Sequence, residues 1–169
     1  MIIVLIGVAG SGKTTLGQML AARLHLAFLD ADELHTPEAV EQMTRGEPLT
    51  DAQRNAWFGR VVAAAEARDP QVLACSALRR AHRDRLRAVG DVRMFLLDVP
   101  ASVLERRLQQ RPGHFFPARL LQSQLETLER TLPEEGIVVV DAARPDAEVL
   151  DAIVANLERN RPGPRHEQW

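Results

Sequence analysis

Eight residues near the start of the chain constrain its fold more than any other feature. Their sequence is Gly7-Val8-Ala9-Gly10-Ser11-Gly12-Lys13-Thr14, which matches the pattern G-x-x-x-x-G-K-[ST] in full. An apolar run, Ile2–Ile6, precedes them, and a helical apolar repeat follows. Glycines let backbone N–H groups turn inward around phosphate oxygens, and a following helix presents its positive end to the same anion. The sequence therefore predicts a strand, a phosphate-binding loop and a helix.

Lysine usage singles out one position in this loop. Of the 21 Lys and Arg residues only Lys13 is a lysine. A compact ammonium on a flexible stem can touch phosphate oxygens inside a tight loop, whereas a guanidinium is larger and rigidly forked. We therefore expect Lys13 to bridge the β- and γ-phosphates of ATP, Thr14 to ligate Mg²⁺, and Thr15 to complete the nucleotide site.

Strand and helix patterns alternate along the rest of the chain. The expected strands are Ile2–Ile6, Leu26–Asp30, Val72–Cys75, Val92–Val99 and Ile137–Asp141. The expected helices cover residues 14–25, 38–43, 51–68, 78–89, 100–111, 119–129 and 146–157. This order predicts an α/β fold with a doubly wound, five-stranded parallel sheet. We expect one domain over residues 1–159 and a loose tail over 160–169.

The composition indicates which kinds of binding partner to expect. The formal net charge of −2 favours neither nucleic acid nor an anionic membrane. The single cysteine, Cys75, suits a reducing compartment, and no apolar run approaches the roughly 18 residues of a membrane span. We expect a cytoplasmic protein that acts on a small molecule.

Two acids follow the second expected strand. Strand alternation would send Asp30 and Asp32 to the same side, at the carboxyl end where ligands bind in such sheets. One carboxylate could hold a Mg²⁺-bound water, and the other could accept a proton from an attacking hydroxyl. The alternative is that they cap the next helix.

Basic residues gather in two further places. Arg107 and Arg111 share one helix face and lead into the loop 112–117, as in a lid that brings positive charge onto a transferred phosphate. The alternative is a solvated helix face. The segment Ser76–Arg80, with Arg83, could bind a substrate carboxylate or could simply be surface.

Taken together, these segments resemble the gluconokinase family of P-loop kinases. The matching segments are Gly7–Thr15, Phe28–His35, Met43–Asp51, Cys75–Arg80, Gly113–Phe116 and Leu121–Glu129. The resemblance runs from about residue 2 to residue 155. It implies phosphorylation of D-gluconate at its 6-hydroxyl by MgATP and a homodimer. It also implies a five-stranded parallel core of the P-loop nucleoside-triphosphate kinase type with a small lid.

The resemblance also implies residue roles. It carries ATP binding to Gly10, Gly12, Lys13 and Thr14, and makes Asp32 the candidate base, which leaves Asp30 as the candidate metal ligand beside Thr14. It places His35, Arg54, Arg79, Arg83 and His114 near substrate or phosphates. It places Arg107 and Arg111 on the lid, with Arg111 acting in catalysis, and Arg144 and Pro145 against the adenine.

Some alternatives stay open at this point. Ala39, Gln53 and Ala56 depart from the family pattern in the acceptor-side region, which leaves room for a related sugar acid. Shikimate-type kinases share the fold and the loop, although their third strand ends in a Gly-rich turn. A nucleoside kinase or a nucleotide-binding regulatory module is also possible. GTPase-like switches are excluded, because their Asn-Lys-x-Asp motif needs a second lysine.

Overall fold

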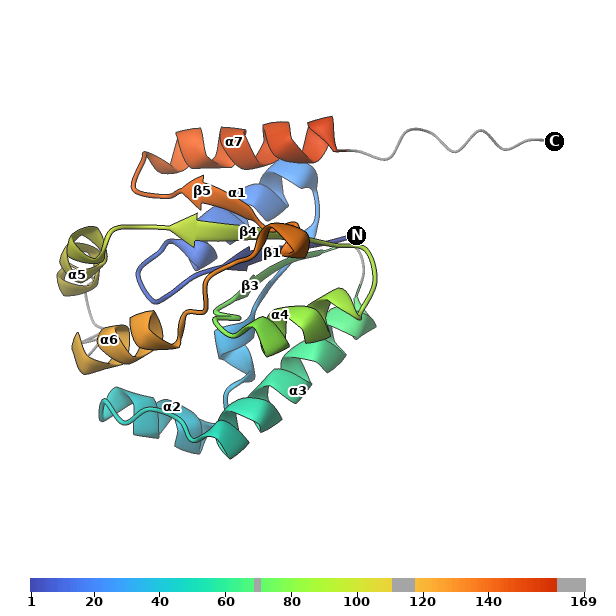
Figure 1. Cartoon of the computed structure of the whole chain (residues 1–169). Helices are drawn as coiled ribbons and strands as arrows, with labels where there is room; N and C mark the ends of the chain where they lie inside the picture. Colours follow the sequence, from blue (N-terminus) through green and yellow to red (C-terminus); the bar gives the residue numbers. More distant parts are fainter. Residues whose placement is uncertain (69–70, 111–117, 161–169) are drawn as a thin grey trace.

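A single parallel sheet organises the chain. The computed structural model describes residues 1–68, 71–110 and 118–160. Its strands lie in the order β2-β3-β1-β4-β5 and all neighbouring pairs are parallel (Figure 1). They are β1 (Ile2–Ile6), β2 (Ala27–Asp30), β3 (Gln71–Cys75), β4 (Val92–Asp98) and β5 (Val138–Asp141). The predicted five-stranded parallel sheet is confirmed.

Both faces of the sheet are covered by helices. The α-helices are α1 (Lys13–Leu24), α2 (Pro37–Thr44), α3 (Asp51–Ala67), α4 (Arg80–Arg87), α5 (Ala101–Gln109), α6 (Ala118–Thr127) and α7 (Asp146–Arg159). Two short 3₁₀ turns, η1 (Ala31–Leu34) and η2 (Pro133–Glu135), were not predicted. Most predicted boundaries lie within one or two residues of the observed ones.

Alternation along β1 divides the core into two clusters. All five residues of β1 are buried, as expected for a central parallel strand. Ile3 and Leu5 pack on one face with residues of α1, α5 and α7, including Leu16, Leu104 and Ile153. Ile2, Val4 and Ile6 pack on the other face with residues of α3 and α4, including Phe58, Val61 and Leu86. The sheet is therefore doubly wound, with α1 and α7 on one side and α3 and α4 on the other (Figure 1).

The helices differ in how they begin. Thr50 caps α3 through a capping box with Gln53. Helix α5 begins after Pro100 and has no side-chain cap. Asp98 ends β4, where its carbonyl accepts a hydrogen bond from the Ala142 N–H at 2.8 Å.

Two sequence predictions fall outside the described ranges. These are the lid segment with Arg111 and His114, and most of the tail 160–169. Within the described ranges, no helix combines the length and apolar character needed to cross a membrane.

Candidate active site

One large cavity lies at the carboxyl ends of the strands. It has a volume of about 1260 Å³, and each of the five strands is followed by residues that line it. A cavity of this size exceeds the roughly 300–1,000 Å³ of a typical single-ligand pocket. It therefore has room for a nucleotide and a second small molecule side by side.

The phosphate loop forms the floor of this cavity. Gly10 and Gly12 have φ angles of 80° and 96°, a left-handed conformation that residues with a Cβ rarely adopt. Gly12 stands immediately before α1, so the helix N-terminus opens into the cavity. The loop residues that line it are Ala9, Gly10, Gly12, Lys13, Thr14 and Thr15. Gly7, Val8 and Ser11 are buried beneath the loop and do not line the cavity.

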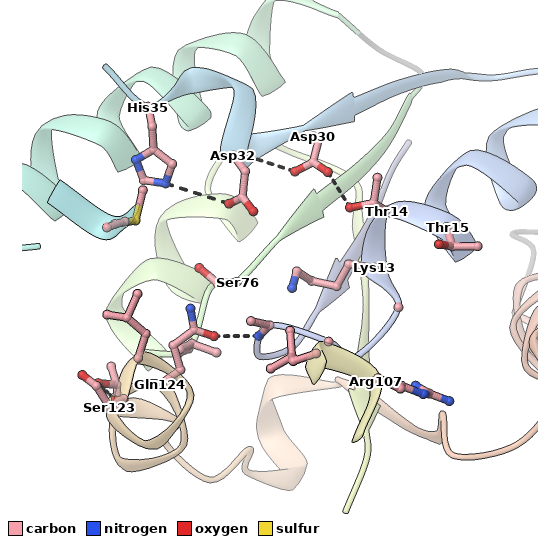
Figure 2. Close-up of a pocket in the computed structure, with 18 of the residues that line it drawn as sticks. Lys13, Thr14, Thr15, Asp30, Asp32, His35, Ser76, Arg107, Ser123 and Gln124 are labelled. Atoms are coloured by element: carbon pink, nitrogen blue, oxygen red, sulfur yellow. Dashed lines mark hydrogen bonds and ion pairs between the residues drawn. The ribbon is translucent and has the colours of Figure 1, made fainter. Parts of the chain in front are cut away.

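The loop lysine is held close to its own backbone. The Lys13 Nζ donates a hydrogen bond of 3.0 Å to the carbonyl of Val8. Figure 2 shows the side chain pointing into the space bordered by Asp32, Ser76 and Gln124. An ammonium in this place can neutralise phosphate oxygens that enter that space.

Thr14 and Asp30 together offer two hard oxygen ligands. The Thr14 hydroxyl donates a hydrogen bond of 2.6 Å to the Asp30 carboxylate (Figure 2). Among the described residues, no three His, Cys, Asp or Glu side chains form a metal cluster. The oxygens of Thr14 and Asp30 fit Mg²⁺, which prefers oxygen ligands. This ion takes few ligands from the protein and keeps waters and phosphate oxygens for the rest.

Asp32 reaches the cavity by a route that alternation did not predict. β2 ends at Asp30, whose carboxylate accepts a hydrogen bond of 3.0 Å from the Asp32 N–H and so caps the turn η1. Both carboxylates line the cavity, but Asp32 does so from η1 and not by strand alternation. Capping and facing the site are not alternatives either, because the Asp30 carboxylate caps η1 and also contacts Thr14. Asp32 itself lines the cavity with 70% of its side chain exposed.

His35 stands beside Asp32 on an aromatic support. Its Nε2 lies 3.9 Å from Asp32 Oδ1, and its ring stacks on Trp57 with centroids 4.6 Å apart. The Trp57 indole in turn donates to the carbonyl of Ala31 at 2.8 Å. Burial lowers the pKa of His35, and the neighbouring Asp32 carboxylate opposes this only in part. His35 is therefore neutral at pH 7 and available as a hydrogen-bonding partner for a hydroxyl group.

A cationic wall lies on the same side of the cavity. Arg54 and Arg79 both line it, and Arg79 pairs with Asp51 at 3.0 Å. Burial, together with the nearby Arg79, lowers the pKa of Arg54. Burial and the surrounding arginines also lower the pKa of His82, which was not predicted as a site residue, to about 4. The only sequence signal for His82 was its position three residues after Arg79.

Arg83 does not belong to this wall, which corrects the sequence expectation. Its side chain is fully buried and absent from the cavity lining. Its guanidinium makes a two-pronged ion pair with Glu135, with N···O distances of 2.7 and 3.0 Å, and also donates to the Leu78 carbonyl. These hydrogen bonds lower the pKa of Glu135 to about 2. Arg83 therefore stabilises the segment that carries Arg79.

The opposite end of the cavity carries the residues expected to meet the nucleotide. Arg107, Arg144 and Pro145 line it. Arg107 donates to the Ala142 carbonyl at 2.9 Å, which fixes the loop after β5. Arg144 pairs with Glu148 at 2.5 Å.

Helix α6 supplies residues to which the sequence gave no role. Leu120, Ser123, Gln124 and Thr127 line the cavity. Gln124 accepts a hydrogen bond of 2.6 Å from the Ala9 N–H of the phosphate loop (Figure 2). The resemblance of Leu121–Glu129 to a family segment was the only signal that this helix matters.

The three acceptor-side departures lie away from the cavity. Ala39, Gln53 and Ala56 are absent from its lining. Gln53 is engaged in the cap of α3 and in a hydrogen bond of 2.8 Å to Gln42. These substitutions therefore do not change the groups that face an acceptor.

A doubly wound parallel sheet with a G-x-x-x-x-G-K-[ST] loop at the end of its central strand defines a P-loop kinase. A family model described as an AAA domain matches residues 2–133. The gluconokinase of Gluconobacter oxydans is 39% identical over 163 residues, covering 92% of this chain and 90% of that protein. The chain belongs to the gluconokinase family.

Solved structures agree with this assignment. A gluconokinase from Sinorhizobium meliloti superposes with a TM-score of 0.85 at 42% identity, covering 93% of this chain and 91% of the other. A shikimate kinase from Bacteroides thetaiotaomicron reaches a TM-score of 0.72 at 20% identity, covering 94% and 98%. The second likeness reflects the shared fold alone.

Proposed function

We propose that this protein transfers the terminal phosphate of ATP to the 6-hydroxyl of D-gluconate, giving 6-phospho-D-gluconate and ADP. It is thus a phosphotransferase with an alcohol acceptor. The observation that carries the proposal is the cavity itself, which joins a complete phosphate loop to a carboxylate, Asp32, and to an arginine wall. The gluconokinase relatives support gluconate as the acceptor.

The nucleotide occupies the loop end of the cavity. Backbone N–H groups of Gly10, Gly12 and Thr15 bind phosphate oxygens, and Lys13 leaves the Val8 carbonyl to contact the β- and γ-phosphates. Arg107, Arg144 and Pro145 border the adenine. Thr14 and Asp30 would hold a Mg²⁺ ion, which would neutralise charge on the phosphates.

The acceptor occupies the end that carries Asp32. Arg54 and Arg79 bind its carboxylate, because guanidinium groups match carboxylates in both charge and geometry. The neutral His35 contacts a hydroxyl group next to Asp32. This arrangement favours a sugar acid over a neutral sugar, and related aldonates remain the alternative acceptors.

Asp32 is the proposed base. It accepts the proton of the 6-hydroxyl while that oxygen bonds to the terminal phosphorus and the bond from phosphorus to the bridging oxygen breaks. ADP keeps the electron pair of the broken bond, and Asp32 then releases its proton to water. Positioning and charge neutralisation supply most of the rate in such transfers.

A coupled assay of ADP release tests the proposal. Gluconate, other aldonates, shikimate and a nucleoside are offered separately with MgATP. We expect release with gluconate above all others. Release with shikimate or the nucleoside, and none with any aldonate, would reject gluconate kinase activity.

The resemblance supports one further property. We infer a homodimer, to be measured by light scattering after size-exclusion chromatography; a monomer at micromolar concentration would reject it. From the composition we also infer a cytoplasmic location with no nucleic-acid partner. Fractionation that placed the protein with membranes would contradict that inference.

A further inference from the structure

One contact ties helix α6 to the phosphate loop. The Gln124 side-chain carbonyl accepts the hydrogen bond from Ala9 N–H at 2.6 Å, although the two residues stand 115 positions apart. Gln124 is half-buried and lines the cavity beside Ser123 and Thr127. In Figure 2, Gln124 and Ser76 lie on the side of Lys13 that faces Asp32, whereas Arg107 lies on the other side. Gln124 is therefore placed at the transfer end of the loop.

Lys13 and Gln124 hold the same peptide group. The carbonyl of Val8 accepts from Lys13 Nζ at 3.0 Å, and the N–H of that same peptide, which belongs to Ala9, donates to Gln124. A hydrogen bond at one end of a peptide polarises it and strengthens the bond at the other end. Movement of Lys13 onto a phosphate therefore weakens the Gln124 contact.

A phosphate oxygen competes for the Ala9 N–H. Loop N–H groups bind phosphate oxygens, and a charged oxygen is a stronger acceptor than a neutral amide carbonyl. A glutamine side chain displaced from this donor still has two N–H groups to offer to the same anion. The exchange needs only a side-chain rotation.

The segment that follows α6 is held to the loop after β3. Glu129 N–H donates to the Leu78 carbonyl at 2.9 Å, and its carboxylate accepts from Arg80 N–H at 2.6 Å. These contacts hold the helix to the segment that carries Arg79. Gln124 thus stands at a set distance from both the loop and the acceptor wall.

Resting on the proposed kinase activity, we propose that Gln124 is a positioning residue that recognises the terminal phosphate of ATP. In the free protein its carbonyl occupies the Ala9 N–H. The terminal phosphate takes that donor, and the released amide donates to the same phosphate and holds it for transfer. ADP, which lacks this phosphate, leaves the Gln124–Ala9 contact in place.

The variant Q124E tests this directly. It keeps the shape and the acceptor but replaces the donor with a negative charge. Calorimetry without acceptor measures the Kd of ADP and of a non-hydrolysable ATP analogue, each with Mg²⁺. We expect the ratio of the analogue Kd to the ADP Kd to rise about tenfold or more, the size of one hydrogen bond to a charged group. kcat is expected to fall as well.

The variant Q124A repeats the measurement of the two Kd values without adding a charge. The ratio of the analogue Kd to the ADP Kd is expected to rise about threefold or more in this variant. The hydrogen bond lost to the charged phosphate contributes more than the removal of the Gln124 carbonyl, which competes for the Ala9 N–H. Q122E is the matched control, since Gln122 lies on the exposed face of the same helix. The ratio of the analogue Kd to the ADP Kd in Q122E should equal that of the wild type.

The proposal would be overturned if the Kd ratio is unchanged in both Gln124 variants, or if the two nucleotides bind more weakly by the same factor. Gln124 would then have a structural role only. Thermal unfolding of each variant shows whether it is folded. If one of Q124E and Q124A fails to fold, the proposal is tested with the other. Since the measurement uses nucleotides alone, a wild type that ignores gluconate would reject the proposed function and not this inference.

Discussion

The Thr14 hydroxyl donates a hydrogen bond of 2.6 Å to the Asp30 carboxylate and so joins the first turn of α1 to the end of β2. The two residues stand 16 positions apart and are brought together because both lie at the carboxyl edge of the sheet. Their oxygens are the pair proposed to hold Mg²⁺.

Asp30→Asn is expected to raise the Mg²⁺ concentration for half-maximal activity about 10- to 100-fold, because a residue that orients a metal ligand typically contributes that much to affinity. Titration of activity with Mg²⁺ at fixed ATP measures it. Thr14→Ser, which keeps the hydroxyl, is the control and should retain the wild-type dependence. The same half-maximal Mg²⁺ concentration in Asp30→Asn and the wild type would remove Asp30 from the proposed metal site.

Asp32→Asn is expected to lower kcat about 10²- to 10⁴-fold, the usual contribution of a positioned base. The Kd of an ATP analogue should stay close to the wild-type value, because Asp32 faces the acceptor. Steady-state kinetics and calorimetry measure the two quantities. Glu41→Gln neutralises an exposed carboxylate of α2 that does not line the cavity, and it should leave kcat nearly unchanged. Near-normal turnover of Asp32→Asn would exclude Asp32 as the base.

Lys13→Arg is expected to abolish most activity although it keeps the positive charge. The wider guanidinium cannot enter the loop where Lys13 Nζ lies 3.0 Å from the Val8 carbonyl. We expect kcat/KM to fall at least about 100-fold, as for the loss of one strong electrostatic contact in the transition state. Thermal unfolding serves to verify the fold. An active Lys13→Arg protein would contradict our explanation of why lysine occurs here alone.

Arg79→Ala is expected to raise the KM for gluconate about tenfold or more while the KM for ATP changes little, because one charge-assisted hydrogen bond to the acceptor is lost. Arg80→Ala is the matched control. Arg80 is exposed, pairs with Glu134 and Asp84, and does not line the cavity. Equal KM values for gluconate in the two variants would argue against Arg79 as a carboxylate ligand.

The buried pair of Arg83 and Glu135 predicts an acid-dependent loss of stability. Because the pKa of Glu135 falls from its ordinary 4.5 to about 2 in the folded protein, its stabilisation is present above pH 4.5 and is lost as the pH falls toward 2. Glu135→Gln should lower the unfolding free energy by about 3–5 kcal/mol, since Arg83 then keeps a buried charge without its countercharge.

Urea unfolding over a pH series measures this effect. The double variant Arg83→Met/Glu135→Leu replaces the pair with apolar groups and is expected to recover much of the lost stability. It should also lack the slope between pH 4.5 and pH 2. A double variant that keeps the wild-type slope would show that other groups cause it.

The sequence predicted what depends on local pattern. A glycine-rich loop followed by Lys13 and Thr14 has few structural outcomes, because it needs left-handed glycines and a helix N-terminus. The apolar run of β1 and the alternation of strands and helices then led to the sheet and its two covered faces. Resemblance added the family, which the comparisons confirmed.

Only the tertiary structure separated residues that look alike in sequence. Arg79 and Arg83 stand four positions apart, yet one lines the cavity and the other is buried against Glu135, 52 positions away. Gln124 contacts the loop across 115 positions, and a 3₁₀ turn rather than strand alternation brings Asp32 to the cavity. The phosphate loop was readable from the sequence because its function lies in consecutive backbone groups. The acceptor wall was readable only in part. The resemblance pointed to Arg54 and Arg79 but also to Arg83, because these side chains are placed by partners that a local pattern does not show.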